Sequence, residues 1–255
     1  MAKRNSVSES QYIKKQNAKD FDNKQTLLDN LLNNPIPKEE LHSNLGLFID
    51  RRLLSRYLFI NELYTKILGL HGKIFEFGVR YGQNLSLFTS LRGIYEPFNH
   101  NRRIVGFDTF EGFVGVDASK DPSSSKSGDY SVTQAYDKFL SNVLSIHESL
   151  APVEQIKKFE LVKGDASITL PKYLSKHQET IISLAYFDMD IYKPTRDCLK
   201  AIVPYLSKGS IIAFDELNDE TWQGESIALR EVLGTNKFKI HHSMFRSAAG
   251  YLIYE

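Results

Sequence analysis

Two short acidic stretches carry the strongest sign of chemistry in this sequence. Asp188 and Asp190 follow the apolar run IISLAYF, and the acid pair Asp215 and Glu216 follows the apolar run GSIIAF. If both runs are neighbouring parallel strands, Asp188, Asp215 and Glu216 lie close together, because the carboxyl ends of parallel strands meet at one edge of a sheet. Carboxylates this close repel one another and take up protons unless a cation lies among them. An all-oxygen set suits Mg²⁺ or Ca²⁺ better than zinc.

A purely structural role is the alternative for these acids. Aspartate is common in turns and at helix caps, so Asp188 and Asp215 could cap the helices that follow, with Glu216 as a solvated surface acid. Three further strand-like runs also finish with an acid near their end, namely Glu76, Asp108 and Asp165. Acids in the same position on five strands favour a ligand with several hydroxyl or amine groups, or a metal.

A glycine-containing turn follows the first of these runs. In the segment EFGVRYGQN, Gly78 and Gly82 let the backbone turn tightly and let a ligand approach it. The segment is not GxGxxG, so a pyrophosphate cradle is poorly supported, and on its own it reads as an ordinary strand-to-helix turn. Asp108 ends the next strand, where a carboxylate can accept both hydroxyls of a ribose. Asp165 could accept from an adenine amino group, so the combination fits the adenosyl group of S-adenosylmethionine better than NAD.

These residues require a scaffold of parallel strands, and the chain after Gly72 has the matching pattern. Short apolar runs alternate with amphipathic stretches, and the strand-like runs are KIFEFGV, RRIVGFD, FELVKGD, IISLAYFD, GSIIAFD and AAGYLIYE. The alternation predicts an α/β fold with a doubly wound, mostly parallel sheet and right-handed crossovers. FKIHHSMF and GYLIYE have no helix between them and predict an antiparallel C-terminal edge.

The remaining segments predict three parts of the chain. Residues 1–24 are polar and lysine-rich, which is typical of a flexible tail. Residues 25–70 carry helical leucine and tyrosine stripes, which predict an N-terminal helical extension that serves dimerisation or covers the acceptor site. Residues 71–255 form the cofactor-binding domain, in which residues 114–130 make a long loop, either a lid or simply mobile.

Composition excludes several classes of protein. The 32 basic and 31 acidic residues give a net charge of +1, so no strong field favours nucleic acid or an anionic membrane. No apolar run is long enough to span a membrane, and the N-terminal residues lack the apolar region of a signal peptide, so we expect a cytoplasmic protein. Cys198 is the only cysteine, which rules out an intramolecular disulfide and favours a packing role.

With these residues in place, the chain resembles the class I S-adenosylmethionine-dependent methyltransferases. More narrowly, it resembles the macrocin O-methyltransferase family, which includes the sugar O-methyltransferases of mycinamicin and novobiocin biosynthesis. The resemblance covers about residues 45–255 and rests on the segments EFGVRYGQN, VGFDTFEGF, VKGDA, YFDMDIYKPT and AFDE. The most specific element is the DxDxY core that starts at Asp188, with an acid pair that begins 27 residues later.

The resemblance implies a Rossmann-like fold and an enzyme that uses S-adenosylmethionine and Mg²⁺, the ion that in that family anchors two vicinal oxygens of a sugar. It implies Asp188, Asp215 and Glu216 as the metal ligands of this chain. The implied cofactor-binding residues are Glu76, Gly78, Gly82, Asn84, Asp108 and Asp165. The family's second paired acid is usually Asp, so Glu216 leaves open how the hydroxyl pair is held and whether the substrate class is the same.

The expected reaction is methyl transfer from S-adenosylmethionine to a hydroxyl of a sugar or a sugar-containing small molecule, in antibiotic or surface-polysaccharide biosynthesis. Asp188 or Asp190 is expected to be the catalytic base, ahead of His241 and His242. Trp222 either packs in the core or stacks on a sugar ring. The alternatives are a methyltransferase for a catechol, an amine or a phosphorylated small molecule, or a non-catalytic protein of the same fold. We expect a homodimer that binds a small molecule and no nucleic acid.

Overall fold

The computed structural model describes residues 18–255, which divide into two units, residues 18–57 and residues 58–255. Residues 1–17, most of the predicted flexible tail, lie outside the described residues. The first unit contains α2 (Ala18–Leu32), α3 (Lys38–Leu41), the 3-10 helix η1 (His42–Phe48) and the start of α4 (Arg51–Lys66). Helix therefore begins at Ala18, earlier than the predicted residue 25. Asp20 lies in the first turn of α2, where an acid is favourable, and pairs with Arg52 at 2.6 Å.

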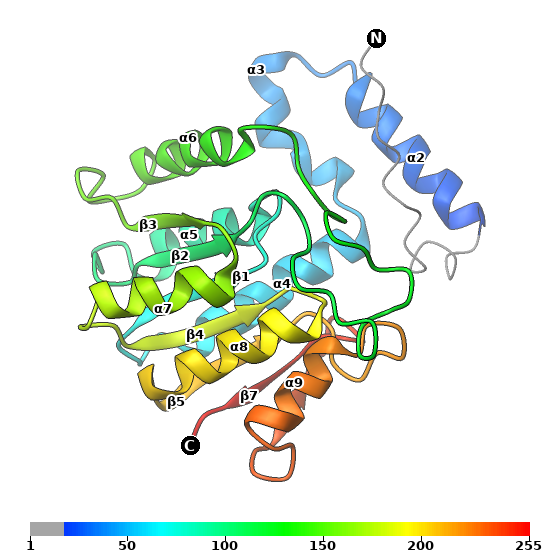
Figure 1. Cartoon of the computed structure of the whole chain (residues 1–255). Helices are drawn as coiled ribbons and strands as arrows, with labels where there is room; N and C mark the ends of the chain where they lie inside the picture. The colour runs from blue at the N-terminus through cyan, green and yellow to red at the C-terminus, as the bar shows by residue number, and fades with distance from the viewer. Residues whose placement is uncertain (1–17) are drawn as a thin grey trace. The chain divides into compact units, whose positions relative to one another are not determined.

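The second unit is built on one sheet, in which the described strands have the order β3-β2-β1-β4-β5-β7-β6 (Figure 1). The strands are β1 (Lys73–Phe77), β2 (Ile104–Asp108), β3 (Phe159–Lys163), β4 (Ile182–Phe187), β5 (Leu206–Phe214), β6 (Ile240–His242) and β7 (Gly250–Ile253). β1 to β5 are parallel, and β7 is antiparallel to both β5 and β6. The predicted parallel sheet and its antiparallel C-terminal edge are both confirmed. The strand order reverses between β1 and β4, where open sheets of this kind bind ligands.

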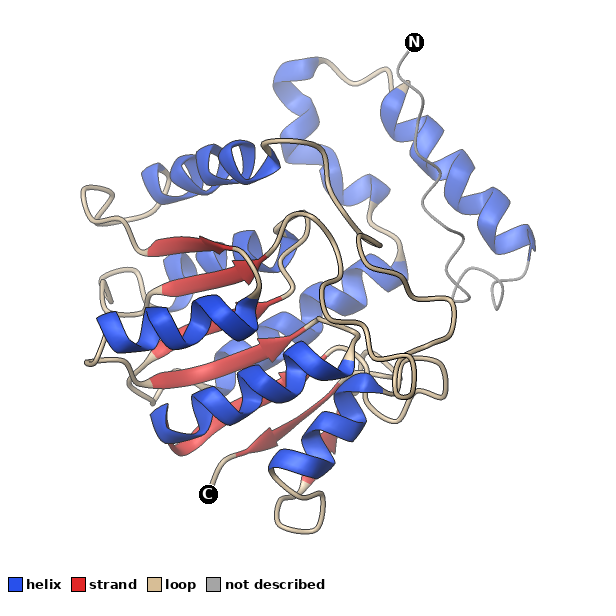
Figure 2. Ribbon diagram, in the orientation of Figure 1, coloured by secondary structure: helices blue, strands red, loops and turns tan. Residues whose placement is uncertain are grey.

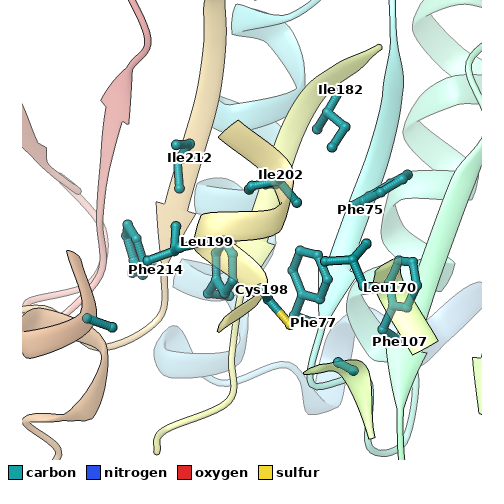
Figure 3. Packing of buried hydrophobic residues seen from close by; sticks show 14 of the residues in the cluster. Phe75, Phe77, Phe107, Leu170, Ile182, Cys198, Leu199, Ile202, Ile212 and Phe214 are labelled. Carbon is teal, nitrogen blue, oxygen red and sulfur yellow. The ribbon is translucent and has the colours of Figure 1, made fainter. Parts of the chain in front are cut away.

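Helices cover both faces of the sheet (Figure 2). One face packs against α7 (Ala166–Lys176), α8 (Tyr192–Ile202) and α9 (Gly224–Val232), and the other against α5 (Gln83–Tyr95), α6 (Tyr136–Ser149) and the part of α4 from residue 58. Each face has its own buried apolar cluster, as a doubly wound sheet requires. Cys198 lies fully buried in the first cluster (Figure 3), where burial raises the pKa of its thiol, so its predicted packing role is confirmed.

A row of four phenylalanine rings crosses the sheet directly below its carboxyl edge. The centroids of Phe107 and Phe77 lie 5.1 Å apart, those of Phe77 and Phe187 4.7 Å, and those of Phe187 and Phe214 5.3 Å. Each such pair contributes about 0.5–1.5 kcal/mol beyond its buried area. Phe77, Phe107 and Phe214 of this row are labelled in Figure 3, in the core. The residues that follow them in the chain are Gly78, Asp108, Asp188 and Asp215. The packed rings therefore hold the ends of four neighbouring strands in place, and the predicted site residues directly follow these phenylalanines.

Candidate active site

The predicted site residues lie along one edge of the sheet, where the backbone continues to bond across neighbouring strands after they end. The amide of Gly78 donates to the carbonyl of Phe107 at 3.0 Å, and that of Asp188 to the carbonyl of Phe77 at 2.9 Å. The amide of Asp215 donates to the carbonyl of Phe187 at 3.0 Å. The loops after β1, β4 and β5 therefore begin side by side, as the sequence predicts.

Gly78 joins the turn after β1 to the loop after β4. Its φ is +87°, a conformation that favours glycine, and a Cβ there would collide with the carbonyl oxygen of Asp188. Gly82 also has a positive φ, at +76°, and directly precedes α5. The two predicted glycines thus let the chain turn into α5 while its backbone contacts the acidic loop after β4.

Glu76 and Asn84 form a buried polar pair under this turn. The Glu76 residue is 1% exposed, and its Oε1 accepts from Asn84 Nδ2 at 3.0 Å. Asn84 lies in the first turn of α5, so the pair links the end of β1 to the start of the next helix. An amide held against a buried carboxylate keeps the carboxylate in one orientation. The structure therefore brings these two predicted cofactor residues together.

Asp108 organises the backbone on both sides of its strand end. Its Oδ2 accepts from the amide of Arg80 at 2.8 Å, and its Oδ1 accepts from the amide of Phe110 at 2.5 Å. Arg80 and Phe110 have φ values of 48° and 56°, left-handed conformations that cost free energy in non-glycine residues. Each carboxylate oxygen can accept more than one hydrogen bond, so this arrangement leaves capacity for the two hydroxyls of a ribose.

Asp165 has a structural role that the sequence left open. Its Oδ1 accepts from the amide of Ser167 at 2.8 Å, and it is the N-cap of α7. A capping aspartate satisfies a backbone donor that the helix itself cannot. The adenine role of Asp165 stays a prediction. The corresponding alternative does not hold for Asp188 and Asp215, because the residues at the N-caps of α8 and α9 are Ile191 and Gln223.

The acids after β4 and β5 lie close enough together to disfavour one another's charged forms. Burial, followed by the charges of Asp190 and Asp215, raises the pKa of Glu216 to about 10. Glu216 Oε2 is buried and has no hydrogen-bond partner among residues 18–255. Glu216 is thus not a solvated surface acid. Its unsatisfied oxygen, with other carboxylates nearby, is what a site for a hard cation provides.

Asp215 is held by a cation that belongs to the protein. Arg246 makes a bidentate ion pair with it, Nη1 to Oδ1 at 2.5 Å and Nη2 to Oδ2 at 2.9 Å, and Tyr186 donates to Oδ1 at 2.5 Å. Within residues 18–255, no three His, Cys, Asp or Glu side chains are arranged to hold a metal ion. The predicted metal triad is therefore not confirmed. In this structure the Arg246 guanidinium neutralises Asp215. Sequence reasoning missed Arg246 because it lies in the turn between β6 and β7.

The two ends of the long loop between β2 and α6 bond to each other and pack against Trp222, which lies in the loop after β5. The amide of Phe113 donates to the carbonyl of Asp129 at 2.9 Å, and the rings of Phe113 and Tyr130 lie 5.0 Å apart. Trp222 packs edge-on against both rings and is 6% exposed. The Arg80 guanidinium lies 4.8 Å from the Tyr130 ring centroid. We call Phe113, Tyr130 and Trp222 the aromatic cluster. Of the two roles weighed for Trp222, the structure shows packing, here between two site loops.

The middle of the same loop is tied to α8. Asp121 Oδ1 accepts from the amide of Tyr192, the first residue of α8, at 2.8 Å, and its Oδ2 accepts from the amide of Asp117 at 2.7 Å. The Lys120 ammonium lies 3.5 Å from the Tyr192 ring centroid. Asp121 was not predicted from the sequence. It couples the long loop to the helix that begins directly after the Asp188 to Asp190 stretch.

Replacing Asp121 with alanine should destabilise the protein by about 0.5–2 kcal/mol, because the first turn of α8 loses its side-chain acceptor. The same change should open residues 114–130 to proteolysis. Asn keeps one of the two acceptor oxygens, so Asp121→Asn should recover only part of both properties. Denaturant unfolding and limited proteolysis with fragment mass mapping measure the two effects. Equal cleavage of wild type and Asp121→Ala would contradict the anchoring role.

The histidine alternative for the catalytic base has less support. The His241 ring stacks on the Tyr251 ring, with centroids 4.9 Å apart, and the two residues pair across β6 and β7. This contact is a cross-strand packing interaction of the kind that stabilises sheets.

No helix within the described residues is long and apolar enough to cross a membrane.

Comparisons with known proteins match this geometry to a family. No protein-family model and no curated protein matches the chain. Among solved structures, CalS11, a calicheamicin methyltransferase, has a TM-score of 0.90 and 43% identity over 94% of both chains. A second structure of CalS11, as the apo form of a TDP-rhamnose 3'-O-methyltransferase, has a TM-score of 0.84 and 41% identity over 94% of this chain and 96% of that one.

A more distant solved structure shares the fold alone. The O-methyltransferase NovP has a TM-score of 0.58 and 14% identity over 78% of this chain and 79% of that one. The identity and coverage of the CalS11 matches, with the doubly wound sheet and acidic strand ends described above, show more than a shared fold. The chain therefore belongs to the class I S-adenosylmethionine-dependent sugar O-methyltransferases, the family that includes CalS11, and it is an O-methyltransferase.

Proposed function

We propose that this enzyme methylates a hydroxyl of a deoxysugar carried on a nucleoside diphosphate, in antibiotic or surface-polysaccharide biosynthesis. The observation that carries the proposal is the 41% identity, over 94% of the chain, to a protein described as a TDP-rhamnose 3'-O-methyltransferase. The acidic strand ends support it, because neighbouring carboxylates suit a substrate with several hydroxyls. The new bond joins the acceptor oxygen to the methyl carbon, the carbon–sulfur bond of the sulfonium breaks, and the hydroxyl proton passes to a carboxylate.

The cofactor is expected to lie across the ends of β1 and β2. Asp108 would accept from the ribose hydroxyls, while Glu76, held by Asn84, lies below the turn at Gly78. The open backbone of that turn lets the donor approach the loop after β4 closely. Alignment of a cationic methyl donor with the acceptor oxygen contributes much of the rate in such a transfer. Asp165 stays the proposed adenine contact, in addition to its capping role.

A divalent cation fits the acids after β4 and β5 chemically. The buried, unsatisfied Oε2 of Glu216 and its carboxylate neighbours supply the oxygen donors that Mg²⁺ prefers. Asp188, Asp215 and Glu216 would hold the ion, and Arg246 would then have to release Asp215. When bound, such an ion lowers the pKa of a coordinated hydroxyl. Asp188 and Asp190 lie on the loop beside this cluster, and we propose that one of them takes the acceptor proton.

The proposed function is tested with isotope-labelled S-adenosylmethionine and TDP-rhamnose, followed by NMR of the transferred methyl group. We expect a new O-methyl signal on the sugar, loss of transfer on addition of EDTA, and its recovery with Mg²⁺. Catechol, a simple amine and a sugar phosphate serve as competing acceptors. Transfer to one of these and not to TDP-rhamnose would replace the proposed substrate class. Undiminished transfer in EDTA would contradict the cation proposal but would not affect the assignment as a methyltransferase.

Cation binding should release a proton and become tighter as pH rises. A carboxyl whose pKa is raised to about 10 is protonated near neutral pH, and a carboxylate must be deprotonated to bind a metal ion. Below that pKa, the apparent affinity for Mg²⁺ should therefore rise by up to about tenfold per pH unit. Isothermal titration with Mg²⁺ in buffers of different ionisation enthalpy counts the protons released. A Glu216→Gln variant should bind weakly without this dependence, and a pH-independent affinity in wild type would contradict the mechanism.

A further inference from the structure

The first turn of α9 packs directly against both acidic loops. α9 begins at Gly224, and a Cβ on Gly224 would lie 2.5 Å from the carbonyl oxygen of Asp190 and 2.5 Å from the amide nitrogen of Tyr192. A distance this short is not tolerated by real side chains, so a glycine is required here. The start of α9 therefore touches the backbone of the loop after β4, at Asp190 itself.

The next residue, Glu225, bonds to the backbone of both acidic loops at once. Its residue exposure is 0%, its Oε1 accepts from the amide of Met189 at 3.1 Å, and its Oε2 accepts from the amide of Glu216 at 3.3 Å. Met189 stands between Asp188 and Asp190, so the first bond fixes the loop after β4. The second bond fixes the loop after β5. One carboxylate thereby spans the two loops.

Ser226 extends this attachment. Its Oγ accepts from the amide of Asn218 at 2.8 Å, farther along the loop after β5. Three consecutive residues of α9, Gly224, Glu225 and Ser226, therefore contact the backbone of the acidic loops. α9 also packs on α8 through the buried cluster that contains Leu229 and Leu199, so its first turn rests on a rigid base.

A carboxylate is an unfavourable choice for packing alone. Burial, with the charges of Asp190 and Glu216 nearby, raises the pKa of Glu225 well above its usual value, and both oxygens of the carboxyl group keep acceptor capacity when it is protonated. The compensating property is two acceptor oxygens set at one fixed separation. Glutamine has the same shape but a single acceptor, because its amide nitrogen is a donor. The two hydrogen bonds therefore require a carboxyl group, although a glutamine of the same shape would fill the same space.

We propose that Glu225 is a positioning residue for methyl transfer, which sets the spacing between the Asp188 to Asp190 stretch and the Asp215 and Glu216 pair. Glu225 acts through the two loops, by holding the amides of Met189 and Glu216. This role rests on the proposed function, because the spacing matters only if both acidic loops serve the reaction. Partners that orient reacting or ligating groups typically change activity or affinity by roughly 10-fold to 100-fold when replaced.

The test compares Glu225→Gln with Glu231→Gln as the matched control. Glu231 lies in the last turn of the same helix, and its carboxylate accepts from the Tyr192 hydroxyl and pairs with Lys200. We expect faster hydrogen exchange at the amides of Met189 and Glu216 in Glu225→Gln only. We also expect its kcat with S-adenosylmethionine and TDP-rhamnose to fall by roughly 10-fold to 100-fold, at an unchanged Kd for S-adenosylmethionine. If the substitution only destabilised the fold, cofactor affinity and melting temperature would fall together with kcat.

Two results would overturn the positioning role. One is unchanged amide exchange and kcat in Glu225→Gln, and the other is a parallel loss of kcat, cofactor affinity and melting temperature. Failure of the proposed function looks different, because wild type itself would then be inactive on TDP-rhamnose. In that case the exchange comparison still tests the contacts, since unchanged protection at Met189 and Glu216 refutes the role, whereas lost protection shows that Glu225 holds the two loops. Glu225→Ala, which removes both acceptors, should show the larger exchange effect.

Discussion

Replacing Asp108 with alanine should weaken binding of S-adenosylmethionine by a factor of about 10² to 10⁴. In the proposed complex its carboxylate accepts from both ribose hydroxyls, and a hydrogen bond to a charged group contributes about 1.5–3 kcal/mol. Isothermal titration of the cofactor measures the change. Glu111→Gln removes a neighbouring, exposed acid and should leave the affinity unchanged. A Kd for Asp108→Ala within a few-fold of wild type would place the ribose elsewhere.

The same substitution should also destabilise the unliganded protein. Asp108 accepts from the amides of Arg80 and Phe110, and a buried donor left unpaired costs about 1–3 kcal/mol. Both residues also have left-handed backbone, which then lacks its support. Asp108→Asn keeps one acceptor oxygen and should lose less stability than Asp108→Ala. Denaturant unfolding without cofactor separates this effect from the loss of binding.

Replacing Asp190 with asparagine should lower kcat by roughly 10² to 10⁴, if Asp190 is the base, because a positioned base contributes rate enhancement of this size. The substitution is a clean one, because Asp190 has a φ of 62° and asparagine tolerates this left-handed conformation. The Kd for S-adenosylmethionine should not change. Asp188→Asn provides the comparison. Because Asp188 is also a proposed metal ligand, the base is identified by its pH profile and not by the size of the loss in kcat alone. Full activity in both variants would mean that the proton leaves by another route.

The pH profile adds a second measurement for this pair. In wild type, kcat should rise with pH as the base loses its proton, and then level off. A variant that lacks the base should lose this rising limb, whereas a variant that only weakens binding keeps it at a lower rate. Single-turnover rates at saturating cofactor, acceptor and Mg²⁺ give the profile without interference from product release or from the pH dependence of cation binding. A rising limb that persists in both Asp188→Asn and Asp190→Asn would exclude both residues as the base.

Much of the fold follows from local pattern. Alternating apolar runs and amphipathic stretches predict the parallel sheet, and the acids at the ends of the runs are predicted to share one edge of it, as observed for Asp108, Asp188 and Asp215. A sharper signal was also present, because each of these acids directly follows a phenylalanine. Those phenylalanines form most of the ring row below the site. The acids and the phenylalanines before them are neighbours in the chain, so this pattern can be recognised from the sequence.

Contacts between distant segments could not be predicted in this way. Arg246 reaches Asp215 from the turn between β6 and β7, and Asp121 reaches Tyr192 across a separation of 71 residues. Glu225 looks like an ordinary acid in the first turn of a helix, and only burial between two loops distinguishes it. Spacing predicts which residues share an edge of the sheet. It does not predict which counter-charge or backbone amide each of them meets there.

The attachment of the long loop to α8 constrains how acceptor preference can change among relatives. Asp121 bonds to the first amide of α8, and the aromatic cluster joins the same loop to Trp222 after β5. A loop transplanted from a homologue would have to bring both attachments with it, or the recipient's acidic segments would lose their neighbours. Successful chimeras should therefore exchange residues 109–135 together with the position of Trp222, and keep an aspartate or asparagine that meets Tyr192. A change in this loop is therefore expected to require matching changes in the two segments that it contacts.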